Sequence, residues 1–108
     1  LALSKNEEFK KLINRKKLSN KYVMIYFGIL ENKDYKKLNI SFVTKKKIGN
    51  AVKRNKIKRR LRGIINDAVK KISIKFKYSY LVIAKPTMLS NEYANIKETL
   101  FQSFEKIK

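Results

Sequence analysis

A dense run of cations occupies the middle of the chain, where residues 45–62 read KKKIGNAVKRNKIKRRLR and contain ten Lys or Arg and no acid. Four of the five arginines of the sequence fall within residues 54–62. A guanidinium presents its N–H donors in a planar fork that grips phosphate through two hydrogen bonds and stacks on bases. Self-repulsion makes such a segment costly to fold unless an anionic partner binds it. These residue types therefore predict binding of a polyanion.

Residue types that perform hydrolysis are scarce. The chain contains no His and no Cys, and only 8 Asp or Glu. A nuclease acting by itself needs a general base or a cluster of carboxylates that holds metal ions. Glu7 and Glu8 are the only adjacent acids, and neighbouring residues of a helix point in different directions. The sequence therefore predicts no catalytic residue and no metal ligand on this chain.

Size and charge narrow the class of protein. At 108 residues, of which 44% are hydrophobic, the chain can bury one modest core, which favours a folded protein over a disordered polycation. We therefore expect a single domain over residues 1–108. The 28 Lys and Arg against 8 acids give a net charge of +20, which indicates nucleic acid or an anionic membrane surface as the partner.

The sequence lacks the marks of a membrane or secreted protein. Its longest apolar run, residues 22–30, has about half the length of a membrane-spanning helix, and no signal peptide is visible. The absence of Cys excludes a disulfide framework, which fits a cytoplasmic protein. Because the chain begins with Leu1 rather than Met, we expect that its start has been trimmed.

A helical pattern begins at Asn50, which is a suitable N-cap residue. Apolar residues then recur at helical spacing and form one stripe over five turns: Ile57, Leu61, Ile64, Ile65, Ala68 and Ile72. Gly63 costs about 1 kcal/mol relative to Ala inside a helix, which a stripe of this length can offset. Gly49 permits a tight turn before the cap, and the N–H groups of the first turn form an additional anion site. We expect a helix over residues 50–72 that packs on a sheet.

The polar residues of this helix fall into rows at 100° per residue. Arg54, Lys58 and Arg62 share one flank, Asn55 and Arg59 form the adjoining row, and Lys53, Lys56 and Arg60 take the opposite flank. A solvated face would mix both signs of charge, yet no acid occurs between Asp34 and Asp67. A membrane-bound helix is a further alternative, but the apolar face is better used against a sheet of this chain. We therefore expect two basic surfaces that make two different contacts.

Asn55 is a poor helix former inside this basic run. One interpretation is a neutral spacer that relieves repulsion between Arg54 and Lys56. The interpretation we favour is an amide that presents both a donor and an acceptor to a base, a ribose or a phosphate-bound water.

Three segments have the pattern of strands, namely residues 22–30, 38–44 and 76–84. In the first, Val23, Ile25, Phe27 and Ile29 are expected on one face, and Tyr22, Met24, Tyr26 and Gly28 on the other. In the second, Leu38, Ile40 and Phe42 are expected to point inward. We expect the first two strands to pair in antiparallel fashion and Pro86 to end the third. Residues 17–21 are a candidate for a further short strand.

Two more helices complete the predicted order α-β-β-(β)-α-β-α. The capping-box pattern Ser4-Lys5-Asn6-Glu7, followed by Phe9, Leu12 and Ile13, predicts a helix over residues 4–14, with a frayed basic arm as the alternative. Ser90 can cap a last helix, whose inward residues are expected to be Tyr93, Ile96, Leu100, Phe101, Phe104 and Ile107.

Residues 46–62 resemble the signature KKxGNAVxRNxIKRxxR of the bacterial ribonuclease P protein subunit. The stretch LSKNEEFKKL at residues 3–12, the strand at residues 23–30 and YLVIAKP at residues 80–86 also follow the order of that family. The resemblance therefore covers nearly the whole chain, and its central motif is long and specific.

The resemblance implies a two-layer α/β (α+β) sandwich with a mixed sheet, of the class of the second domain of ribosomal protein S5. It also implies that the basic helix lies in a left-handed β-α-β crossover, which general rules disfavour and which patterning cannot reveal.

The resemblance implies a function as well: the accessory subunit of a ribonucleoprotein that removes the 5′ leader from precursor tRNA. In that family, the RNA subunit holds the catalytic Mg²⁺ ions and performs the hydrolysis. The protein binds this RNA through the basic helix and the single-stranded leader in a cleft between sheet and helices. We therefore expect ribonuclease P RNA and precursor tRNA as partners, with no membrane and no small-molecule substrate.

The resemblance also implies site residues, by their positions in the motif and in the family's leader cleft. The candidates for RNA contact are Lys46, Lys47, Asn50, Lys53, Arg54, Asn55, Lys56, Lys58, Arg59, Arg60 and Arg62, and those for the leader-binding cleft are Phe9, Ile13 and Tyr26. From the residues alone, core packing of Phe9 and ordinary sheet packing of Tyr26 remain alternatives. Ile13 replaces a common aromatic, so we expect the cleft to stack one base less.

Several positions depart from the family pattern, and one other function stays open. Ser41, Lys45, Arg60 and Gly63 are atypical, which concerns the shape of the cleft and leaves the Arg-Asn centre of the motif intact. A ribosomal or general RNA-binding protein is the alternative that composition alone favours. The sequence does not assign the two helix flanks to the catalytic RNA and the substrate.

Overall fold

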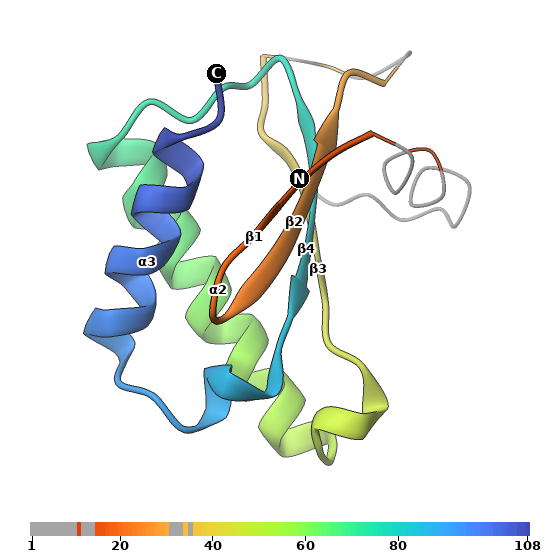
Figure 1. Ribbon diagram of the computed structural model, residues 1–108, viewed down its shortest axis with the longest axis vertical. Coiled ribbons are helices and arrows are strands. Elements are labelled where there is room, and N and C mark those ends of the chain that lie inside the picture. Colours follow the sequence, from red (N-terminus) through yellow and green to blue (C-terminus); the bar gives the residue numbers. More distant parts are fainter. Residues whose placement is uncertain (1–10, 12–14, 31–33, 35) are drawn as a thin grey trace.

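The computed structural model describes residues 11, 15–30, 34 and 36–108. Its elements in chain order are β1 (Lys16–Ser19), β2 (Val23–Gly28), β3 (Asn39–Val43), the 3₁₀ turn η1 (Lys46–Ile48), α2 (Ala51–Lys71), β4 (Ser79–Ala84), the 3₁₀ turn η2 (Pro86–Leu89) and α3 (Tyr93–Glu105). The sheet forms one layer, and α2 and α3 lie side by side on one of its faces (Figure 1). This arrangement confirms the predicted two-layer α+β sandwich.

The order of strands in the sheet is β1-β2-β4-β3. β2 pairs with β1 and with β4 in antiparallel fashion, whereas β3 pairs with β4 in parallel. The predicted antiparallel pairing of the strands in residues 22–30 and 38–44 is therefore wrong, because β4 lies between them. Almost every residue of β4 is buried, which suits an inner strand, but the alternation within a strand carries no information about its neighbours.

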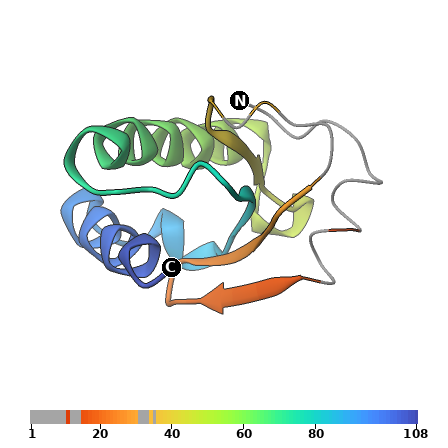
Figure 2. The same ribbon diagram turned by 90° about the horizontal axis from the view of Figure 1, so that it is seen from above.

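The basic helix α2 crosses from β3 to the adjacent parallel strand β4. Both strands run downward in Figure 1, so they recede from the viewer in Figure 2. In Figure 2 the path from β3 through α2 to β4 turns anticlockwise as it recedes, which is the left-handed sense. The crossover implied by the resemblance is thus present, against the usual right-handed preference.

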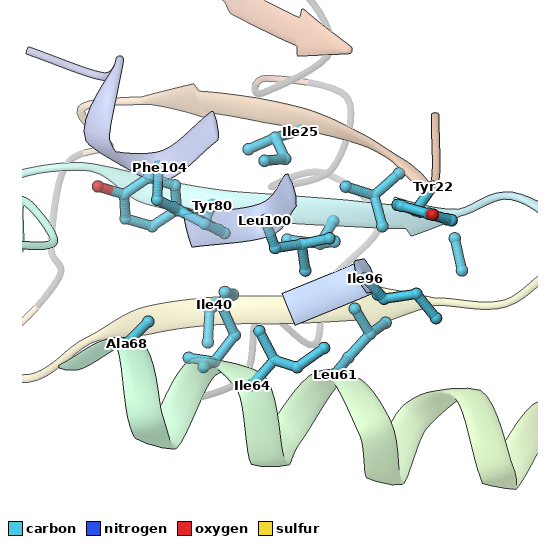
Figure 3. Close-up of a cluster of buried hydrophobic side chains, with 14 of the residues drawn as sticks. Tyr22, Ile25, Ile40, Leu61, Ile64, Ala68, Tyr80, Ile96, Leu100 and Phe104 are labelled. Carbon is cyan, nitrogen blue, oxygen red and sulfur yellow. The ribbon is translucent and has the colours of Figure 1, made fainter. Parts of the chain in front are cut away.

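The core is built between the sheet and the two helices. The buried residues of α2 are Ile57, Leu61, Ile64, Ile65 and Ala68, which confirms the predicted stripe; Ile72, just past the end of the helix, is half-buried. In Figure 3, Leu61, Ile64 and Ala68 point from α2 toward the sheet. From α3, Ile96, Leu100 and Phe104 are buried against the same core. This ridge of apolar side chains fixes which sides of α2 remain on the surface.

Two expectations for β2 fail at its ends. Ile29 is 57% exposed, because the strand ends at Gly28 and the alternation does not continue. Tyr22, expected on the outer face, precedes the strand and is buried in the main core. The short strand considered for residues 17–21 exists as β1, one residue earlier at its start.

The last helix begins later than predicted. α3 starts at Tyr93 with Glu92 at its N-cap position, whereas Ser90 ends η2 and its N–H group donates to the carbonyl of Thr87. Tyr93 was expected inward but is 37% exposed. The third strand also starts later, at Ser79 rather than at residue 76. The helix predicted over residues 4–14 lies outside the described residues, apart from Lys11.

Candidate nucleic-acid interface

Residues just before α2 fix the position of its first turn. The side-chain Oδ1 of Asn50 accepts a hydrogen bond from the N–H group of Lys53 at 3.0 Å, as expected of an N-cap. Gly49 has φ 156°, a conformation that other residues rarely adopt, and a Cβ there would meet Cδ of Lys53 at 2.8 Å. Ile48 in η1 is buried and ties the turn to the core. The orientation of the first turn of α2 is thus set by these three residues.

The basic side chains of this region differ in how far they are exposed to solvent. Arg54, Lys58 and Arg60 are half-buried. The remaining candidates for RNA contact are exposed, namely Lys46, Lys47, Asn50, Lys53, Asn55, Lys56, Arg59 and Arg62. All of them lie on η1, on the turn that follows it or on α2, so one continuous segment of the chain carries the whole set.

Most of these cations have no counter-ion among the described residues. Among the described residues, the ion pair is formed by Lys97 Nζ and Asp67 Oδ2 at 2.6 Å, and it joins α3 to the second half of α2. The hydrogen bond from Lys97 holds the pKa of Asp67 below its usual value. No carboxylate of the described part of the chain pairs with Arg54, Arg59 or Arg62. Within this part of the chain, no carboxylate competes with an external anion for these three arginines.

Arg60 differs from the other arginines. Its Nη1 donates to the carbonyl oxygens of Met88 at 3.1 Å and of Asn91 at 3.2 Å. These bonds tie α2 to η2 and to the segment that leads into α3. Spacing along the sequence could not show this, because both acceptors are main-chain groups about 30 residues away. A structural role for Arg60 therefore accompanies the predicted RNA contact.

Arg54 is also held closely by the protein. Its Nε is buried and has no hydrogen-bond partner among the described residues. An unpaired buried donor costs about 1–3 kcal/mol. The fold thus keeps Arg54 at this place without gaining a hydrogen bond from Nε.

The two flanks of α2 face different surroundings. Lys58 and Arg62 line a groove of about 690 Å³ together with Leu38, Ile40 and Phe42 at the β3 edge of the sheet. On the opposite flank, Arg60 contacts η2 and the segment that leads into α3. That the two basic flanks make two different contacts stays a prediction. The sequence patterns did not reveal the groove.

Tyr26 lies on the other face of the sheet. It is half-buried and packs against a small apolar cluster of Leu30 and Leu81, with Val43 and Ile83 beside it. This cluster is separate from the core under α2 and α3. Phe9 and Ile13, the other two residues predicted for the leader-binding cleft, lie outside the described residues. The composition of that cleft therefore remains a prediction.

The described residues form neither a metal-binding cluster nor a membrane-spanning helix. Within the described ranges there is no group of three or more His, Cys, Asp or Glu that could hold a metal ion. Over the same part of the chain, neither helix has the length and apolar character that a bilayer span requires.

Comparison with known proteins gives a consistent result. Residues 1–108 match the family model described as Ribonuclease P. The chain is 34% identical over 110 residues to the ribonuclease P protein component of Carboxydothermus hydrogenoformans, covering 98% of this chain and 90% of that protein. It is 35% identical over 105 residues to the component from Bacillus pumilus, covering 96% and 85%.

Solved structures agree with these relatives. The RNase P protein of Staphylococcus aureus superimposes with a TM-score of 0.82 at 26% identity, over 99% of this chain and 94% of that one. The RNase P protein of Thermotoga maritima gives a TM-score of 0.82 at 25% identity, over 100% and 98%.

Proposed function

This chain belongs to the ribonuclease P protein family and is part of an endoribonuclease that matures the 5′ end of tRNA; we propose that it acts there as an RNA-binding subunit that performs no hydrolysis itself. The observation that carries this proposal is the surface of α2, where exposed arginines that pair with no carboxylate of the described residues stand on a helix anchored by a buried ridge. We further propose that residues 1–108 form one domain and that it works in the cytoplasm, where its tRNA substrate is made.

The hydrolysis is assigned to the RNA subunit. The chain has no His or Cys to serve as a general base, and its described residues contain no cluster of acids that could hold a divalent ion. The described residues therefore do not fit a Mg²⁺ site, and we place the catalytic Mg²⁺ on the phosphates of the RNA partner and substrate.

The contribution of the protein is electrostatic and positional. Two polyanions, the catalytic RNA and the precursor, repel each other, and a chain with a net charge of +20 between them lowers that repulsion. In this proposal, two rows of α2 contact phosphates. One row is Arg54, Lys58 and Arg62, and the other is Asn55 and Arg59. Because α2 is held rigidly, these contacts also fix the register of the bound RNA.

Reconstitution tests the proposed function. Purified protein alone should leave precursor tRNA intact, whereas its addition to a bacterial catalytic RNA at low Mg²⁺ should restore removal of the leader. Polylysine of equal total charge serves as the control for simple charge neutralisation. If the protein fails to restore cleavage, or if polylysine restores it equally well, the alternative of a ribosomal or general RNA-binding protein is favoured instead.

Tyr26→Ala tests the leader-binding cleft. The substitution should weaken binding of leader-bearing tRNA by about fivefold or more, the value of one base stacked on an aromatic ring, and should leave binding of mature tRNA nearly unchanged. Affinity is measured for both tRNAs with the reconstituted enzyme. Tyr93→Ala, which removes an exposed ring on α3, is the matched control. Equal weakening of both tRNAs by Tyr26→Ala would show that this ring only packs against the sheet.

A further inference from the structure

The groove between β3 and α2 is lined by residues of the basic motif and by residues outside it. It has a volume of about 690 Å³, within the roughly 300–1,000 Å³ of typical small-ligand sites. Besides Lys58 and Arg62, its walls include Phe76, Val69 and Lys70, all of which follow the motif at residues 46–62. Tyr26 is absent from these walls, because its ring lies on the other face of the sheet. The groove is thus a feature separate from the predicted leader-binding cleft.

The floor of the groove is apolar and includes aromatic rings. Phe42 and Phe76 are half-buried at the margin of the main core, and each leaves part of its ring on the groove. Val69 is 42% exposed, one of few large apolar side chains of the described residues that remain so open. Exposed apolar surface that is gathered in a concave site favours contact with a ligand. A flat, apolar group fits this floor.

The rim of the groove carries positive charge. Lys37, Lys58, Arg62 and Lys70 surround the apolar floor, and Asn66 adds one amide. None of the described residues that line the groove is acidic. Cations around an aromatic floor suit an unpaired nucleotide, which offers a planar base and a phosphate about one base width apart. An extended peptide added to the β3 edge would need acidic side chains to match the same rim.

We propose that this groove binds an unpaired nucleotide of RNA, with the base against Phe42, Phe76 and Val69 and the flanking phosphates on Arg62 and Lys70. The proposal rests on the proposed function only in that the chain binds RNA. The groove continues the flank of Arg54, Lys58 and Arg62 past the end of the motif, so a strand bound along this flank reaches it without a break. The groove is therefore a second single-strand site, on the helix side of the sheet.

A short RNA tests the groove directly. Fluorescein-labelled pentauridylate, which has no secondary structure, is titrated against the full chain and followed by anisotropy. Phe76→Leu keeps an apolar side chain but removes the ring, and should weaken binding about fivefold. Lys70→Ala should weaken it about threefold and make the slope of log affinity against log salt shallower by about 0.7, the value for one phosphate of a single strand.

Two matched variants control these substitutions. Phe101→Leu removes a half-buried ring from α3, and Lys71→Ala removes the next cation of the same helix turn; neither residue lines the groove. Both should bind the RNA like the wild type. If Phe76→Leu lowers the thermal stability, Val69→Asp serves instead, because it places a negative charge at an exposed helix position and should weaken binding more than tenfold.

The outcomes separate this proposal from the proposed function. The proposed nucleotide site would be rejected if Phe76→Leu and Lys70→Ala bound the RNA as tightly as their controls. It would also be rejected if an acidic peptide, but not unlabelled RNA, displaced the labelled RNA. A wild type that restores tRNA cleavage while all groove variants bind normally keeps the function and rejects the groove. If the wild type fails to restore cleavage but the groove variants bind the RNA weakly, the groove is kept and the proposed function is rejected.

Discussion

Replacement of Arg59 by alanine is expected to lower the affinity of the chain for ribonuclease P RNA about tenfold or more. Arg59 is exposed on α2, and no carboxylate of the described residues competes for it. A hydrogen-bonded contact to a charged group contributes about 1.5–3 kcal/mol, and 1.4 kcal/mol is a factor of ten in affinity. Arg54→Ala should act in the same direction. Affinity is measured by filter binding over a range of salt concentrations.

The salt dependence separates specific contacts from diffuse charge. If about six phosphates are neutralised, log affinity should fall with log salt at a slope of about −4 to −5, and loss of one contact should reduce that slope by about 0.7–0.9. Lys106→Ala, at an exposed position beyond the end of α3, should change nothing measurable. Equal losses at Arg54, Arg59 and Lys106 would show that total charge, rather than the geometry of α2, determines binding.

Arg60→Ala provides a second comparison because its side chain is engaged within the fold. Loss of its bonds to Met88 and Asn91 leaves two main-chain carbonyls without this donor. We expect the free energy of unfolding to fall by about 1–3 kcal/mol, whereas the affinity of the folded protein for RNA falls less than in Arg59→Ala. A larger loss of affinity at Arg60 than at Arg59, with unchanged stability, would contradict the role in joining α2 to η2.

Leu61→Ala is expected to produce the largest loss of stability. Leu61 is fully buried in the centre of the ridge that α2 presents to the sheet. Leu→Ala changes at such sites cost about 2–5 kcal/mol, a large part of the roughly 5–15 kcal/mol that stabilises a small protein. The variant should therefore unfold at much lower urea concentration, and its RNA affinity at 37 °C should fall together with the folded fraction.

Val52→Ala is the matched control for Leu61→Ala. Val52 lies on the same helix but is 75% exposed, so its truncation should change the free energy of unfolding by at most about 0.5 kcal/mol. Urea unfolding followed by circular dichroism measures both variants. Similar midpoints for the two would mean that the ridge of α2 does not anchor the helix.

Local chemistry explains why α2 was predictable in detail. Its apolar period, from Ile57 to Ala68, is imposed by the geometry of a helix that has one side on a sheet. The cap at Asn50 involves a residue only three positions away, so the signal and its partner are contained in one short stretch. Family resemblance supplied the left-handed crossover, which no local pattern encodes.

Contacts between distant segments explain what the sequence did not reveal. The insertion of β4 between β2 and β3 depends on which strands meet in three dimensions, and a strand that is apolar on both faces suits any inner position. Arg60 looked like its neighbours because its acceptors are main-chain carbonyls, which have no residue signature. The groove needed Lys37, Val69 and Phe76 to be brought together from three separate places in the chain.

The position of β4 has a consequence for how the protein is made. β4 follows the other three strands of the described sheet in the chain, yet it lies between β2 and β3 and pairs with both. At about 5–20 residues per second, translation of the stretch from Arg62 to Ala84 takes about 1–4 seconds. During that interval the arginines of α2 have been synthesised, but the sheet on which α2 packs is still incomplete. Ribosomal RNA is the polyanion closest to the nascent chain. Rapid synthesis of β4 therefore favours release of the folded protein over binding of the partly folded chain to ribosomal RNA.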